Sequence, residues 1–236
     1  MRSEMYKSSK IYKAPKMYKS SLAWLVVIGL LATTAAHAQD VELLVKHTAV
    51  SYGPDGVKRS TEFSERVSRA KDSLWISRVL PTDSHSDHDH AKGGKDHKHI
   101  DVTTASRWIS RDASGAVQMR LIPKDEKVVV AISKTDYGNV GFDGSWAAAW
   151  SLVDPAALKR MKASATVGGL TTYTLTEKDR AVKVVWNAKL QMPVSVESND
   201  KTSRRQTLVQ VVSSPPVRPW EKLQGFTQKD YSDYLD

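Results

Sequence analysis

The sequence contains no cysteine among its 236 residues. Disulfide bonds, thiolate metal ligands and cysteine nucleophiles are therefore excluded, and the stability of the fold has to come from packing. The chain also lacks an apolar run of about 20 residues, the length that a membrane-spanning helix needs, so we expect no permanent membrane span. It has neither a Gly-x-Ser-x-Gly elbow nor a glycine-rich phosphate-binding loop, two motifs that would indicate a serine hydrolase or a nucleotide-dependent enzyme.

The N-terminus is typical of an export signal. A basic stretch precedes the apolar residues 22–31, and Ala36-His37-Ala38 follows with small residues at the cleavage-type positions. This pattern predicts a signal peptide, residues 1–38, that is cut after Ala38. The lack of cysteine excludes a lipid-anchored lipoprotein and favours the bacterial periplasm over eukaryotic secretion. Because MYKSS occurs twice, translation could start at Met1, Met5 or Met17.

Much of the positive charge belongs to this predicted signal. The whole chain has 35 basic and 26 acidic residues, and six of the basic and one of the acidic residues lie in 1–38. The remaining 29 and 25 give a net charge of +4 over about 198 residues, enough for one domain with a core. No basic patch interleaved with aromatic residues is left, so we expect no nucleic-acid partner.

Alternating polar and apolar residues dominate the chain after residue 38. A period of two, with aromatic and β-branched residues, is typical of half-buried strands. Turn signals separate the segments at short intervals, which indicates a meandering antiparallel sheet over residues 39–212. The predicted strands are 41–46, 61–67, 73–80, 106–110, 116–122, 127–133, 169–176, 181–187, 193–197 and 205–212.

Two segments interrupt the strand pattern. Asp154 and Pro155 supply an N-cap and a first-turn proline, which predict a short helix over about 155–162, and the alanine-rich residues 145–152 favour helix before it. Trp146 and Trp150 would then share a face, which packs on the sheet or, in the alternative, stacks on a ligand. The proline-rich start of residues 213–236 predicts a surface tail that does not continue the sheet, anchored by Trp220, Phe226 and Tyr231.

Several strands resemble those of LolA-like outer-membrane lipoprotein carriers. Residues 186–200 (WNAKLQMPVSVESND) and 207–212 (TLVQVV) resemble the late strands of this family, and residues 63–67 with 74–78 resemble its opening hairpin. The resemblance covers about half of the chain after the signal. It implies a mainly β fold, in which a single curved antiparallel sheet forms a half-barrel and short helices cover its concave face.

The same resemblance implies an apolar cavity between the helices and the sheet. The ligand would be a lipid or an acylated protein, and we name Trp75, Trp146 and Trp150 as candidate cavity residues. In LolA an arginine governs closure of the cavity, and Arg66 and Arg78 are candidates here by location.

The most unusual segment is residues 85–99, HSDHDHAKGGKDHKH, within an insertion at 83–101 that holds five of the seven histidines. If the Gly-Gly pair forms a two-residue hairpin turn, His90 faces His97 and His88 faces His99. Opposed side chains share one face of a hairpin, so four imidazoles would converge on one ion. Imidazole and carboxylate ligands without sulfur suit a divalent transition metal such as zinc, copper(II) or nickel, and we name zinc or copper(II) as the expected cofactor. The candidate metal ligands are His85, His88, His90, His97 and His99.

Three alternatives to this metal site are open. The segment has almost no apolar residue, so it could be a solvated loop, and its clustered imidazoles could sense pH near 6. An enzyme is the third, but His-x-Asp-His-Asp-His differs from the His-x-His-x-Asp-His pattern of metallo-β-lactamase-like hydrolases. The isolated His47 has no visible acid or serine partner and is expected to be structural.

Together these patterns predict a periplasmic binding protein that is not an enzyme. Its ligand would be a divalent metal at the histidine hairpin, an apolar molecule in the cavity of the sheet, or both. The alternatives are a lipid or lipoprotein carrier with an incidental histidine loop, and a metal-dependent envelope enzyme.

Overall fold

The computed structural model describes residues 40–80, 100–213 and 215–235. The predicted signal peptide and the histidine segment 85–99 lie outside these residues. The described residues all belong to one unit, which spans Ala36–Asp236. Within them, no helix combines the length and the hydropathy that crossing a membrane requires.

The strands occur where the alternation of the sequence predicts them. Ten strands match the ten predicted segments: β1 (Val41–Tyr52), β2 (Lys58–Ala70), β3 (Ser73–Val79), β4 (Ser106–Arg111), β5 (Val117–Ile122), β6 (Val128–Ile132), β8 (Leu170–Glu177), β9 (Arg180–Asn187), β10 (Met192–Asp200) and β11 (Ser203–Ser213). Two short strands, β7 (Lys162–Ala163) and β12 (Thr227–Asp230), were not predicted.

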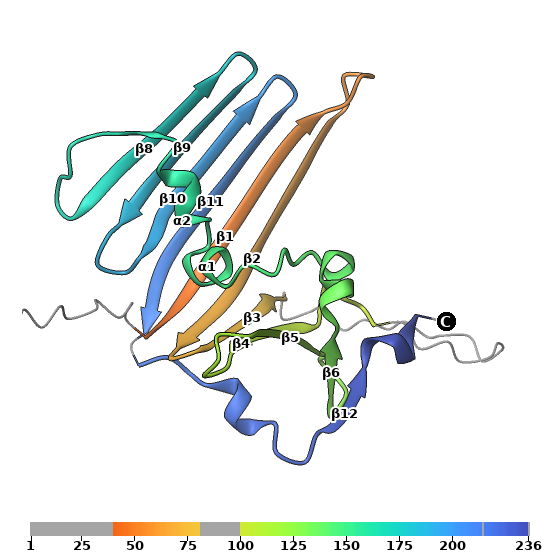
Figure 1. Cartoon of the computed structure of the whole chain (residues 1–236). Coiled ribbons are helices and arrows are strands. Elements are labelled where there is room, and N and C mark those ends of the chain that lie inside the picture. The colour runs from red at the N-terminus through yellow and green to blue at the C-terminus, as the bar shows by residue number, and fades with distance from the viewer. Residues whose placement is uncertain (1–39, 81–99, 214, 236) are drawn as a thin grey trace, which may run out of the picture. The chain divides into compact units, whose positions relative to one another are not determined.

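The strands form one 12-stranded sheet in the order β12-β6-β5-β4-β3-β2-β1-β11-β10-β9-β8-β7. The long strand β1 joins the two halves, because it pairs with β2 on one side and with the late strand β11 on the other. Figure 1 shows that β3 to β6 turn away from the direction of β1, β2 and β8 to β11. The prediction of a mainly β fold built on a single curved sheet is therefore confirmed.

The C-terminal segment corrects one expectation. Residues 215–220, expected not to continue the sheet, form no strand, but Thr227–Asp230, expected to run over the surface, pairs with Val128–Ala131 as a parallel edge strand. Its anchors hold it there, since Trp220 and Phe226 pack on the face of the sheet that carries Trp75. Burial of these aromatic side chains brings a segment without strand periodicity against β6.

The helices are short. Helix α1 (Trp146–Ser151) begins at Ser145, whose side chain accepts a hydrogen bond from the amide of Ala148. Helix α2 (Pro155–Leu158) begins with the predicted cap and proline but ends four residues before the predicted end, because Lys162–Ala163 pairs with β8. The remaining turns of helix are 3-10: η1 (Lys134–Val140), η2 (Pro219–Lys222) and η3 (Tyr231–Tyr234).

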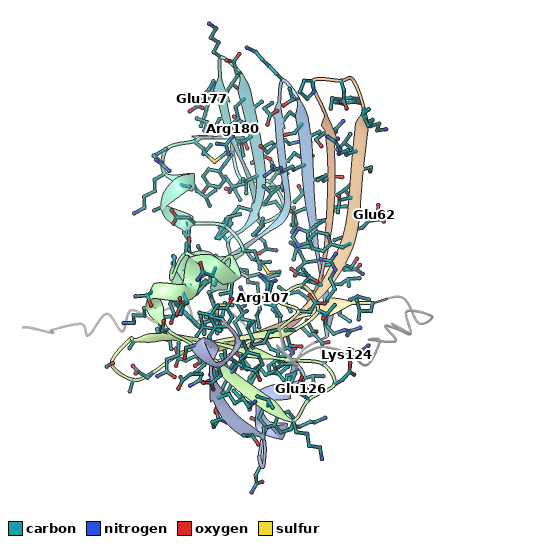
Figure 2. The ribbon with its side chains drawn as sticks, turned by 90° about the vertical axis from the view of Figure 1, so that its right-hand side faces the viewer. Glu62, Arg107, Lys124, Glu126, Glu177 and Arg180 are labelled. Atoms are coloured by element: carbon teal, nitrogen blue, oxygen red, sulfur yellow. The ribbon has the colours of Figure 1, made fainter. Side chains whose placement is uncertain are left out.

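The core lies between these helices and one face of the sheet. We call this the inner face, and it carries alternate side chains such as Leu43, Val67, Leu74, Ile109 and Leu121. Trp146, Ala149 and Leu152 of the α1 region pack against it. Figures 1 and 2 place α1 and α2 on this side of the sheet and leave the far ends of β8 to β11, β1 and β2 without a helix in front.

Candidate functional site

A pocket of about 640 Å³ lies beside helix α1 at one end of the sheet. The start of β1, the β2–β3 turn, the end of β4 and the β9–β10 turn meet there, because the antiparallel register brings these chain positions to the same end. Its volume is within the range of small-ligand pockets, about 300–1,000 Å³. Its lining residues are Asp40, Lys71, Asp72, Arg111, Trp146, Ala147, Trp150, Ser151, Pro155 and Gln191.

Two tryptophans form one wall of the pocket. Trp146 and Trp150 are one helical turn apart in α1, and their rings stack with centroids 5.1 Å apart, as the spacing predicts. Arg111 lies 5.0 Å from the centroid of Trp146, and Arg69 lies 4.9 Å from that of Trp150. Each ring thus has a guanidinium within cation–π distance, and these contacts help to order both indoles.

Arg69 ties α1 to the sheet. This residue of β2 is fully buried on the inner face, opposite Val41 and Leu74. Its Nη1 donates a hydrogen bond of 2.9 Å to the carbonyl of Trp150, and its Nη2 donates one of 2.6 Å to the carbonyl of Leu190. A cation at the last turn of a helix satisfies carbonyls that have no partner within the helix.

Burial lowers the pKa of Arg69 to about 10, although the charge of Asp40 opposes the shift. The guanidinium therefore remains protonated at neutral pH. A buried cation is costly, and the hydrogen bonds to the two carbonyls together with the charge of Asp40 offset that cost.

Arg69 was not among the arginines named from the sequence. Of the two candidates, Arg66 pairs with Glu42 at 2.6 Å, and Arg78 lies over the ring of Phe63. Neither has a hydrogen bond to a helix in the part of the chain that the structure describes. A signal was present in the sequence, since Arg69 is in phase with Val67 and Phe63 on the buried side of its strand.

The opposite wall of the pocket is charged. Asp72 accepts two hydrogen bonds from Arg111, at 3.1 and 2.7 Å, and Asp40 accepts one from the backbone amide of Lys71. The Lys71 ammonium has no ion-pair partner among the described residues. The pocket thus combines an aromatic wall with one available positive charge, a combination that suits a ligand with an apolar body and a polar end.

Residues with a strained backbone conformation lie at this pocket. Three non-glycine residues have positive φ among the described residues, Lys71 (54°), Leu152 (58°) and Gln191 (50°). Lys71 and Gln191 line the pocket, and Leu152 directly follows its lining residue Ser151. Residues other than glycine rarely adopt a positive φ. Strained backbone positions of this kind cluster at functional sites, where the surrounding structure holds them in place.

The third predicted cavity residue lies elsewhere. Trp75 alternates with Leu74 and Ile76, so it lies on the outer face. There it lines a separate pocket of about 520 Å³ with Ile122, Leu223 and Phe226, near the Lys124 and Glu126 labelled in Figure 2. The structure therefore brings Trp146 and Trp150 together but not Trp75.

The candidate metal ligands His85, His88, His90, His97 and His99 are outside the described residues. Within the described ranges, no group of three or more metal-binding side chains is placed to hold an ion. His47 does have partners that the sequence did not reveal: its Nδ1 is 3.1 Å from Thr207 Oγ1, and its Nε2 is 3.4 Å from Glu65 Oε2.

Comparisons with known proteins give similarities of fold. No protein-family model matches the sequence, and no curated protein matches it significantly. Among solved structures, PNGF-II is similar with a TM-score of 0.37 and 8% identity, over 82% of this chain and only 32% of the PNGF-II chain. A putative outer membrane lipoprotein-sorting protein domain from Vibrio parahaemolyticus is similar with a TM-score of 0.32 and 10% identity, over 78% of this chain and 89% of the other. A LolA superfamily protein from Nitrosomonas europaea is similar with a TM-score of 0.30 and 8% identity, over 79% of this chain and 95% of the other. The structural neighbours thus include the superfamily that the strand patterns resemble.

Proposed function

We propose that this protein is an exported binding protein that carries an apolar or acylated ligand in the pocket beside α1. The observation that carries the proposal is the joined arrangement of Trp146, Trp150 and Arg69. The two indoles offer an ordered apolar wall, and the helix that bears them is tied to the sheet through the Arg69 guanidinium.

The residues of the pocket wall favour contact with the apolar part of the ligand. Trp146, Ala147, Trp150 and Pro155, which belong to α1 or the start of α2, supply apolar lining of the pocket. Aromatic surface of this kind contributes large contact area at small entropic cost. Lys71 would contact the polar end of the ligand.

Helix α1 would be the movable wall. It is six residues long, too short to be stable by itself, so its position depends on packing and on the Arg69 hydrogen bonds. Weakening the hydrogen bond from Arg69 to the Trp150 carbonyl would release α1 and open the pocket without breaking the sheet. A binding protein that must both hold and release its ligand needs such an element.

The test is a titration of the purified protein with N-phenyl-1-naphthylamine, an uncharged apolar fluorophore. We expect saturable binding that weakens about tenfold or more in Trp146→Ala and Trp150→Ala, the size of a central aromatic contact. Trp108→Ala is the matched control, because Trp108 is also half-buried and lies under an arginine, Arg120 at 4.4 Å, but on the outer face. An equal loss of affinity for the fluorophore in all three variants, or no saturable binding by the parent protein, would reject the proposal.

A further inference from the structure

One half of strand β2 forms an open edge of the sheet. Strand β3 pairs with β2 only from Ser64 to Ala70, whereas β1 pairs with β2 from Lys58 to Arg69. Residues 58–62 are all exposed, and the described residues place no strand beside them on the side away from β1. Figure 1 shows this half of β2 as the outermost of the long strands, and Figure 2 labels Glu62 on it.

Three residues of the open edge direct their backbone groups away from β1. The amide of Gly53 donates a hydrogen bond to the carbonyl of Val57 across the β1–β2 turn. Hydrogen-bonded positions alternate along an antiparallel ladder, so the odd-numbered residues of β2 bond to β1, and Lys58, Ser60 and Glu62 point the other way. Their N–H and C=O groups have no backbone partner among the described residues. Such an edge is a template for another strand.

The side chains along this edge complement themselves. Residues 58–62 read Lys-Arg-Ser-Thr-Glu, with opposite charges at the two ends. If two copies pair antiparallel about a twofold axis at Ser60, Lys58 of each copy lies opposite Glu62 of the partner subunit. Lys58 has no ion-pair partner among the described residues. Glu62 uses Oε1 to contact Lys46 at 2.8 Å, which leaves Oε2 for a second cation.

The neighbouring registers fit less well. A shift by two residues in one direction would place Arg59 opposite itself, and like charges directly opposed are unfavourable. A shift in the other direction would pair Lys58 with Ser64, which already pairs with Val79 of β3. The length of the open edge and its charges therefore select one antiparallel register, centred on Ser60.

We infer that the open edge of β2 is an interaction surface for a second copy of this chain, so that two sheets join into one. The pair of Ser60 residues would exchange two backbone hydrogen bonds, and each of the two pairs of Lys58 with Glu62 would exchange two more. This small interface predicts weak association, with a Kd on the order of 10–100 µM. The inference goes beyond the proposed function, because this edge lies at the opposite end of β1 and β2 from the α1 pocket.

Sedimentation equilibrium of the purified protein, at concentrations on either side of this Kd, measures the association. Lys58→Glu and Glu62→Lys should each weaken dimerisation about tenfold or more, because each variant places like charges opposite one another at two positions. An equimolar mixture of the two variants should associate as strongly as the parent protein, since every opposed pair then again has opposite charges. Lys178→Glu, at an exposed position of the β8–β9 turn, is the matched control and should change nothing.

Introduced cysteines report the register, because the chain has none of its own. The Cα atoms of a hydrogen-bonded antiparallel pair are about 5.5 Å apart, a distance that a disulfide can span. Ser60→Cys should therefore form a disulfide-linked dimer on mild oxidation. Lys58→Cys should not, because it lies four residues, or roughly 13 Å, along the strand from its counterpart.

Three outcomes would each overturn the inference: a monomer at all concentrations, a mixture that associates no better than the single variants, or equal disulfide formation by the two cysteine variants. Hydrogen exchange tests whether another part of the same chain covers the edge. The amides of Lys58, Ser60 and Glu62 should become protected as the protein concentration rises, and protection that is independent of concentration would also overturn the inference. Lys58→Glu should bind N-phenyl-1-naphthylamine like the parent protein, so a failure of this inference is distinct from a failure of the α1 pocket.

Discussion

The guanidinium of Arg69 binds Trp150 twice, by stacking on its indole ring and by donating a hydrogen bond to its backbone carbonyl. One residue of the sheet therefore fixes both the position of helix α1 and the orientation of a side chain that it presents to the pocket. The second hydrogen bond, to the carbonyl of Leu190, ties the β9–β10 turn to the same point. The pocket wall and the contact that holds it to the sheet therefore depend on the same residue.

Replacing Arg69 should loosen α1 before it affects the sheet. We expect Arg69→Ala to lower the free energy of unfolding by about 2–4 kcal/mol, because two partly buried carbonyls lose their donor. Hydrogen exchange should show faster exchange of the α1 amides, with β4 and β5 unchanged under native conditions. Arg120→Ala is the control, since Arg120 stacks on Trp108 without bonding a helix. Uniform acceleration across the sheet would contradict this role.

Lys71 provides a test of the strain at the pocket. At its φ of 54°, glycine should be more stable than alanine by about 1 kcal/mol, because a Cβ atom is disfavoured in this region. At Lys159, where φ is −64°, the order should reverse. Urea unfolding of the four variants measures both differences, and alanine as the more stable residue at both positions would be inconsistent with strain at Lys71.

Glu65 should make the free energy of unfolding depend on pH in the acid range. Burial by itself would raise the pKa of Glu65, but its hydrogen bond with His47 and the charges of Arg107 and Arg78 outweigh this effect and lower the pKa below 4.5. Its interactions therefore contribute fully above about pH 4.5 and are lost as the pH falls through the lower folded-state value.

Denaturant unfolding between neutral pH and pH 3 measures this contribution. Glu65→Gln should lose less stability on acidification than the parent protein. Glu62→Gln, at an exposed ion pair of the same strand, should follow the parent protein closely. Identical acid profiles for the parent and Glu65→Gln would show that the carboxylate is not held in this way.

The histidine segment stays a prediction from sequence. Titration with zinc and copper(II) should show stoichiometric binding, and replacing His88, His90, His97 and His99 together by alanine should abolish it. His85→Ala alone should have a smaller effect, because His85 lies outside the symmetric pairs about the Gly-Gly turn. Full-strength binding by the quadruple variant would place the metal elsewhere in the chain.

The strands could be predicted because each buries one face. In 61–67 or 205–212, apolar residues alternate with polar ones because successive side chains point to the inner and outer faces of the sheet. The ten predicted segments therefore agree with the observed strands. The parallel pairing of β12 could not be predicted, since Thr227–Asp230 has no alternation and its position depends on distant contacts of Trp220 and Phe226.

The pocket was predictable only in part. The four-residue spacing of Trp146 and Trp150 predicts their stacking, because it is a local helical property. The charged wall depends on which turns meet at one end of the sheet, and Asp72 and Arg111 are adjacent only through the pairing of β3 with β4. The same holds for His47, whose partners lie on β2 and β11.

The most direct test of the proposed binding function is photo-crosslinking with a diazirine-labelled acyl chain, followed by mass spectrometry of the labelled peptides. We expect labels on the peptide that contains Trp146, Trp150 and Pro155, competed by unlabelled lipid. Labels confined to the outer-face pocket of Trp75 and Phe226, or label on the α1 peptide that excess lipid does not reduce, would contradict a ligand site beside α1.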